Sequence, residues 1–125
     1  MRNNKIFFSY TLRDSEINID ILLSIKNKFR DYSTVETYFD ILDNCSPDHQ
    51  GYVYKVLEES NILCLIKSSD VNSSSWVGKE LYIARQRNIP IIEINEKDIN
   101  QILNCNSRDE FMKNSKVEEM IFANM

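Results

Sequence analysis

The chain has 125 residues, with 42% hydrophobic and 27% charged side chains and a formal net charge of −4. This length and composition favour one domain with a single core, over residues 1–125, and exclude a disordered chain. The lack of a basic stripe argues against a nucleic-acid partner, and the longest apolar run, Ile62–Ile66, is too short to cross a bilayer. With no signal-peptide pattern and three scattered cysteines, we expect a cytoplasmic protein that does not bind membranes.

The first part of the chain predicts two strands with a helix between them. The segment KIFFSY (Lys5–Tyr10) is short, aromatic and β-prone. Residues 14–29 carry isoleucines at fourfold spacing, which predicts an amphipathic helix that starts at Asp14, where negative charge is stabilising. A second strand is expected at Val35–Phe39, and the polar segment 41–51 that follows it predicts a loop.

The rest of the chain continues the alternation of helices and strands. We expect a helix at Tyr52–Ser60, a fully buried strand at Ile62–Ile66, a helix from Ser73 to about Asn88 and a strand at Ile91–Ile94. The helix from Ser73 should bury a surface formed by Trp76, Val77, Leu81, Tyr82 and Ala84. Residues 98–103 fit either a short helix or an edge strand, and the capping-box sequence SRDE at 107–110 predicts a terminal helix.

Strands that alternate with helices predict an α/β fold with a mostly parallel sheet covered on both faces. In such folds, ligands bind in the crevice beyond the carboxyl ends of the strands. The polar residues expected at those ends are Ser9, Tyr10, Asp40, Ser68 and Ser69, with Glu80 near the start of the following helix. The pattern therefore gathers these side chains around one rim of the sheet.

Several common sites are excluded by their missing residues. The turn after the first strand is SYTLRD, and the only glycines are Gly51 and Gly78, so neither a Rossmann glycine clamp nor a Walker A loop is present. A nucleotide would therefore bind as a substrate rather than as a permanently held cofactor. The single histidine, His49, excludes a multi-histidine metal site, and a solvated loop position is the favoured interpretation for it.

Trp76 and Glu80 lie one helical turn apart and therefore share a helix face. In one interpretation, Trp76 anchors the helix in the core and Glu80 is a solvated acid near the helix N-terminus. Because surface acids greatly outnumber catalytic ones, the residues considered alone favour this interpretation. In the other, Glu80 points into the crevice and stabilises the oxocarbenium-like state of glycosidic cleavage. One carboxylate suffices when the leaving group is already cationic, as the nicotinamide of NAD is.

Five segments between Lys5 and Ile94 occur in a characteristic order: FFSY, YFD, Ser60 before ILCLI, S-x-W-x-x-x-E-L and IPII. Together with Asp14 at the first helix, they resemble a Toll/interleukin-1 receptor (TIR) domain. The resemblance implies a flavodoxin-like three-layer sandwich with four or five mostly parallel strands. In the bacterial and plant branches it also implies cleavage of NAD at the nicotinamide–ribose bond. The region after the fourth strand is short, so we expect the fifth strand and its preceding helix to be compressed or replaced.

The resemblance also assigns roles to individual residues. Glu80 matches the catalytic glutamate of the family, and Trp76 matches the tryptophan that lines the same site. The segment 41–50 matches the loop that mediates assembly and flanks the pocket. NAD is expected as substrate, with no cofactor and no metal. The expected substrate-binding residues are Phe8, Ser9, Tyr10, Asp14, Asp40, Ser69 and Trp76.

A stand-alone TIR domain of this size resembles the signalling subunits of bacterial antiphage systems such as Thoeris. This implies self-association between TIR domains and a separate effector protein that is activated by an ADP-ribose-derived product. Two alternatives stay open. One is a non-catalytic TIR adaptor that acts through assembly alone. The other is an enzyme similar to nucleoside deoxyribosyltransferases, in which the glutamate would be a covalent nucleophile.

Overall fold

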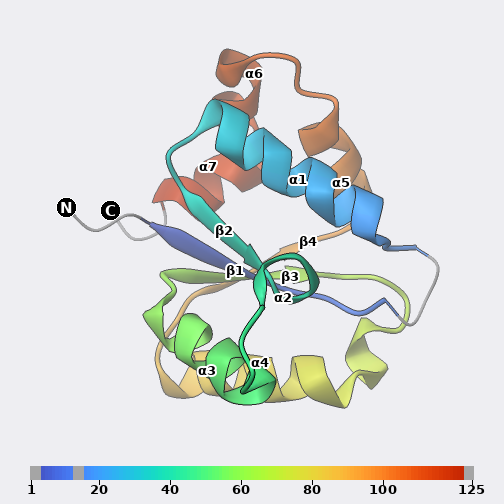
Figure 1. The fold of residues 1–125 in the computed structure, drawn as a ribbon. Coiled ribbons are helices and arrows are strands. Elements are labelled where there is room, and N and C mark those ends of the chain that lie inside the picture. The colour runs from blue at the N-terminus through green and yellow to red at the C-terminus, as the bar shows by residue number, and fades with distance from the viewer. Residues whose placement is uncertain (1–3, 13–15, 123–125) are drawn as a thin grey trace.

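The computed structural model describes residues 4–12 and 16–122 and has at its centre a four-stranded parallel sheet (Figure 1). The strands are β1 (Lys5–Ser9), β2 (Glu36–Phe39), β3 (Ile62–Ile66) and β4 (Ile91–Ile94). Their order across the sheet is β2-β1-β3-β4, which is the order of the first four strands of a flavodoxin-like sheet. The predicted parallel sheet is confirmed, and β3 and β4 have the predicted bounds.

Helices cover both faces of the sheet (Figure 1). One face carries α1 (Ile19–Tyr32), α5 (Glu96–Leu103), α6 (Arg108–Lys113) and α7 (Ser115–Phe122), and the other carries α3 (His49–Glu59) and α4 (Ser75–Gln86). The short α2 (Asp40–Asp43) follows β2 directly, and a 3-10 turn, η1 (Val71–Ser73), precedes α4. The predicted α/β sandwich is therefore confirmed. Within the described residues, no helix is both long and apolar enough to span a membrane.

The core is divided by the sheet into two hydrophobic clusters, because successive strand side chains point to opposite faces. Phe8 and its neighbour Cys64 face α1, whereas Phe7 and Leu63 face α3 and α4. Phe8 pairs in register with Phe39 of β2, and their rings stack with centroids 4.2 Å apart. This aromatic packing fixes the carboxyl ends of β1 and β2, from which the candidate site is built.

The first helix begins later than the sequence predicts. α1 starts at Ile19, where the side chain of Asn18 caps it by accepting a hydrogen bond from the Ile21 N–H (2.9 Å). Ile17 is buried in the core ahead of the helix, and Glu16 accepts a hydrogen bond from the Ser69 backbone N–H (3.1 Å). These two contacts hold residues 16–18 outside the helix. Asp14, the predicted start, lies outside the described residues.

The segment after β2 is more ordered than the predicted loop. It contains α2, and α3 already begins at His49, three residues before the predicted Tyr52. Asp48 caps this helix by accepting a hydrogen bond from the Gly51 N–H (3.3 Å). Gly51, at the end of the predicted loop, therefore lies in the first turn of α3.

The region beyond β4 consists of helices only, within the residues that the structure describes. Asn95 and Asp98 form a reciprocal capping box at α5, with both hydrogen bonds at 2.9 Å, so 98–103 is helical. Ser107 caps α6 as predicted, but Glu110 accepts its reciprocal bond from the Asn106 N–H. Two short helices, α6 and α7, stand in place of the single terminal helix. In the described residues, α5 to α7 thus follow β4 and no fifth strand is formed.

Candidate functional site

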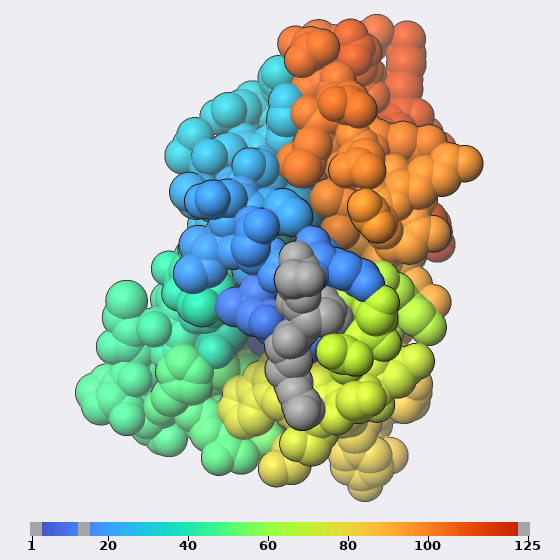
Figure 2. Space-filling view, turned by 90° about the vertical axis from the view of Figure 1, so that its right-hand side faces the viewer, coloured from blue at the N-terminus to red at the C-terminus, as the bar shows by residue number. Residues whose placement is uncertain are grey.

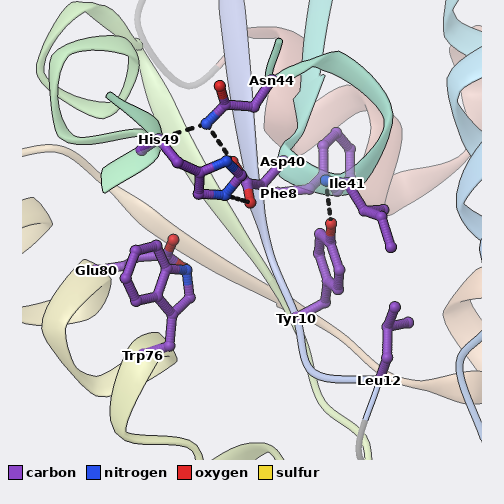
Figure 3. Close-up of a pocket in the computed structure, with 9 residues that line it drawn as sticks. All are labelled: Phe8, Tyr10, Leu12, Asp40, Ile41, Asn44, His49, Trp76 and Glu80. Carbon is purple, nitrogen blue, oxygen red and sulfur yellow. Dashed lines mark hydrogen bonds and ion pairs between the residues drawn. The ribbon is translucent and has the colours of Figure 1, made fainter. Parts of the chain in front are cut away.

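A cleft of about 420 Å³ opens at the carboxyl end of the sheet. Figure 2 shows this side of the molecule, where the blue end of β1, the green segment after β2 and the yellow start of α4 meet. The residues that line the cleft are Phe8, Tyr10, Leu12, Asp40, Ile41, Asn44, His49, Trp76 and Glu80 (Figure 3). They come from β1 and the segment that follows it, from the two ends of α2, and from the starts of α3 and α4.

Glu80 is placed in this cleft by the way α4 packs. The Ser74 side chain caps α4, and Val77 and Ala84 anchor the helix in the core on the same face as Glu80. The carboxyl group is consequently carried inwards, and Glu80 is only 2% exposed. The Ser9 hydroxyl, also buried, donates a hydrogen bond to Glu80 Oε1 at 2.7 Å. The interpretation of Glu80 as a solvated acid is therefore wrong.

Burial dominates the electrostatics of Glu80 and raises its pKa to about 8. The charge of Asp40 raises this pKa further, whereas hydrogen bonds from Ser9 and Trp76 oppose the shift. With no cation beside it, the carboxyl group is thus largely protonated at neutral pH. A positive charge placed beside it would favour the ionised form, because opposite charges lower the pKa of an acid.

Asp40 forms a second, rigidly held wall of the cleft (Figure 3). Its Oδ1 accepts hydrogen bonds from the Tyr38 hydroxyl (3.0 Å) and the Asn44 amide (2.9 Å). Its Oδ2 lies 2.7 Å from His49 Nε2. Burial, followed by the effect of Asp40, raises the pKa of Tyr38 well above its usual range, so the phenol keeps its proton and acts as a donor. Donors from β2, the end of α2 and α3 therefore fix this carboxylate.

The position of His49 was missed by sequence reasoning. The side chain is exposed, as expected, but the residue begins a helix and reaches Asp40 across the cleft wall. A pair nine residues apart in sequence that joins two helices has no recognisable spacing. The one local signal is Asp48 after a proline, which is typical of a helix start and would have placed His49 on α3.

Aromatic rings complete the cleft. Trp76 is half-buried and stacks on Tyr54, with ring centroids 6.1 Å apart, while also lining the cleft beside Glu80 (Figure 3). The Tyr10 hydroxyl accepts a hydrogen bond from the Ile41 N–H at 2.9 Å, which ties the end of β1 to the start of α2. Tyr82, which was predicted to lie in the buried surface of α4, is instead 63% exposed.

The structure brings most of the predicted site residues together. Phe8, Tyr10, Asp40, Trp76 and Glu80 line the cleft, and Ser9 contacts Glu80 from within the sheet. The segment 41–50 flanks the cleft through Ile41, Asn44 and His49.

Two predicted residues are not part of the described cleft. Ser69 is not among its lining residues, because its backbone N–H and its hydroxyl both bond to the Glu16 carboxylate. Asp14 lies outside the described residues. Leu12 at the mouth was not predicted, because an exposed leucine in a loop carries no sequence signal.

The chemical character of the cleft follows from its lining. Among the described lining residues, the acidic side chains are Glu80 and Asp40, and the basic one is His49. Residues 4–12 and 16–122 contain no group of three His, Cys, Asp or Glu side chains that could hold a metal ion. The arrangement is suited to stabilising positive charge on a bound molecule.

No protein-family model matches this chain, and no curated protein matches it significantly. The resemblance to TIR domains therefore stays a prediction.

Proposed function

We propose that the protein cleaves the nicotinamide–ribose bond of NAD, as a TIR-type glycohydrolase or cyclase. The products are nicotinamide and an ADP-ribose-derived molecule. The observation that carries the proposal is the buried Glu80 carboxyl group, held by Ser9 at 2.7 Å and lining a cleft large enough for a nucleoside. Placing a carboxyl group in such a position costs folding free energy, which function would account for.

Cleavage of this bond requires few other catalytic groups from the protein. Nicotinamide leaves NAD as a neutral molecule, so no general acid is needed to protonate the leaving group. As the C–N bond breaks, its electron pair stays on the ring nitrogen and positive charge develops on the ribose. Glu80 in its ionised form stabilises that charge from a water-poor position, where an electrostatic interaction is strong. The cationic substrate itself favours the ionised form of Glu80.

The other lining residues have positioning roles in this mechanism. Trp76 and Tyr10 provide faces against which the nicotinamide ring packs, and the fixed carboxylate of Asp40 accepts hydrogen bonds from ribose hydroxyls. Water attack on the ribosyl cation gives ADP-ribose, whereas attack by another part of the same molecule gives a cyclic product. From the resemblance, we extend the proposal to bacterial antiphage signalling, with TIR self-association and an effector activated by the product.

The test is nicotinamide release from NAD by the purified protein at high concentration, with and without a crowding agent that promotes self-association. We expect release by the wild type and a loss of at least about 100-fold in Glu80→Gln, which keeps the volume but not the charge. Glu93→Gln, an exposed acid on β4 away from the cleft, is the matched control and should retain full activity.

Three results would contradict the proposal. The absence of release under every condition would reject the enzyme and favour an adaptor that acts by assembly. Release that survives in Glu80→Gln would reject the assigned role of Glu80. A sugar adduct trapped on Glu80 from a nucleoside substrate would favour the deoxyribosyltransferase-like alternative.

A further inference from the structure

His49 and Asp40 form a histidine–carboxylate pair in the wall of the cleft. Asp40 Oδ2 lies 2.7 Å from His49 Nε2, and Asp40 Oδ1 is held by the Tyr38 hydroxyl and the Asn44 amide. Because a carboxylate only accepts hydrogen bonds, Nε2 carries the proton of the neutral imidazole ring. The other ring nitrogen, Nδ1, keeps its lone pair and has no hydrogen-bond partner in the part of the chain that the structure describes. The pair therefore presents a base whose ring is oriented by a fixed carboxylate.

The exposure of His49 suits a group that passes protons to solvent. Its side chain is 56% exposed, whereas Glu80 in the same cleft is 2% exposed. Figure 3 shows the His49 ring beside Asp40, on the side of the cleft where Glu80 and Trp76 lie. A molecule that fills the cleft is thus reached from α4 by an acid shielded from water and from α3 by a base open to it.

We propose that His49 is the general base for water: it takes a proton from the water molecule that attacks the ribose, and so directs the reaction towards hydrolysis. The inference rests on the proposed cleavage of NAD, in which His49 has no other role. The water oxygen forms a bond to the anomeric carbon, whose bond to nicotinamide has broken, and one water proton moves to His49 Nδ1. Asp40 stabilises the resulting imidazolium cation from 2.7 Å, and the exposed ring then releases the proton to solvent. The products are nicotinamide, ADP-ribose and one proton.

A second nucleophile separates this role from the cleavage itself. The ring nitrogen of 3-acetylpyridine can attack the same ribosyl cation but has no proton to lose, so it needs no base. With both nucleophiles present, the wild type should form ADP-ribose by hydrolysis and an acetylpyridine dinucleotide by exchange. In His49→Gln, the ratio of ADP-ribose to exchange product should fall at least about tenfold, because only hydrolysis uses the base. Exchange should persist, since this variant leaves Glu80 intact.

Asn44→Ala is the control for a purely structural role of His49. The Asn44 amide also joins α2 to α3, because it donates to Asp40 Oδ1 (2.9 Å) and to the His49 backbone carbonyl (3.0 Å). Its removal weakens this connection but leaves the imidazole in place. The product ratio should therefore stay within about twofold of the wild-type value, even where total turnover changes. If Asn44→Ala shifts the ratio as much as His49→Gln does, His49 acts by holding the two helices together and the inference is wrong.

Deuterium oxide gives a test that needs no variant. Proton transfer from water to a base slows in D₂O, whereas attack by the pyridine nitrogen involves no such transfer, so the wild-type ratio should fall. An unchanged ratio in D₂O or in His49→Gln would overturn the inference and leave cleavage through Glu80 standing. If no NAD is cleaved under any condition, the proposed function and this inference both fail.

Discussion

At the scale of single residues, the burial of Glu80 links stability to pH. The unfolded chain binds the Glu80 proton with an ordinary pKa near 4.5, whereas the folded state has a pKa of about 8. Folding therefore favours the protonated form. The contribution of this pKa difference to the free energy of unfolding is fully present below pH 4.5, decreases as the pH rises, and is lost above pH 8. The difference amounts to roughly 5 kcal/mol at most, which is large compared with the total stability of a domain.

Glu80→Gln should accordingly stabilise the protein at alkaline pH, whereas it should remove the proposed NAD cleavage. A glutamine can still accept the Ser9 hydrogen bond but has no charge to bury. In urea unfolding, we expect the variant and the wild type to be nearly equal at pH 5, and the variant to be several kcal/mol more stable at pH 9. Glu93→Gln, at an exposed site, should change stability by less than about 0.5 kcal/mol at either pH. If the difference in stability between the variant and the wild type were the same at both pH values, folding would not shift the pKa of Glu80, as is expected of a solvated side chain.

At the scale of the element, the start of α4 sets which residues reach the cleft. Ser74 ends the preceding turn and accepts a hydrogen bond from the Val77 N–H at 3.2 Å, which satisfies one of the free donors of the first helical turn. Trp76 and Glu80 follow within that turn and the next. The cap therefore determines the register in which α4 presents both side chains.

Removal of this cap in Ser74→Ala should cost about 1 kcal/mol of the free energy of unfolding. The next residue offers a matched control, because Ser75 is exposed at the first helical position, where alanine is well tolerated. Ser75→Ala should be neutral or slightly stabilising. Both variants are measured by urea unfolding. The slope of the free energy of unfolding against urea concentration should be the same as in the wild type. If the two variants lose equal stability, Ser74 is not the cap.

The elements also show what sequence could and could not predict. The strands and α4 were predictable because their apolar patterns and capping serines are local signals. The start of α1 was not, because Ile17 is held by the core and Glu16 by Ser69, a residue 53 positions away. Local signals were also overlooked at α3 and α5, where Asp48 and Asn95 cap the helices.

The candidate site also has one part that the sequence could predict and another that it could not. Its strand-end residues followed from the alternation of elements, since parallel strands bring their carboxyl ends to one edge of the sheet. The burial of Glu80 could not follow, because a glutamate near a helix start gives no sign of which face the helix turns inwards. The pairing of His49 with Asp40 depends on how α2 and α3 are joined, and that geometry is tertiary.

At the scale of the whole molecule, the sheet separates α4, which carries Trp76 and Glu80, from the C-terminal helices, whereas Phe8 and Tyr10 of the cleft lie on the α1 face. Phe111 of α6 is fully buried against α1, with its ring centroid 5.0 Å from that of Phe29 in an edge-to-face arrangement and 5.7 Å from that of Tyr32. It belongs to the hydrophobic cluster on the α1 face, whereas Trp76 packs against the cluster on the α3 and α4 face. A change in the packing around Phe111 should therefore lower the stability without moving Trp76.

Phe111→Ala should lower the free energy of unfolding by about 3–5 kcal/mol, because it leaves a cavity between α6 and α1. Phe122, at the end of α7, is the matched control, since the same substitution at a side chain that is 45% exposed should cost less than about 1 kcal/mol. Both variants are measured by urea unfolding, and the indole N–H signal of Trp76, the single tryptophan, is followed in the folded state by ¹H–¹⁵N NMR. That signal should stay unchanged in Phe111→Ala, because the substituted residue lies across the sheet from α4. A shifted Trp76 signal would show instead that the two faces are coupled, and that packing far from the cleft contributes to its geometry.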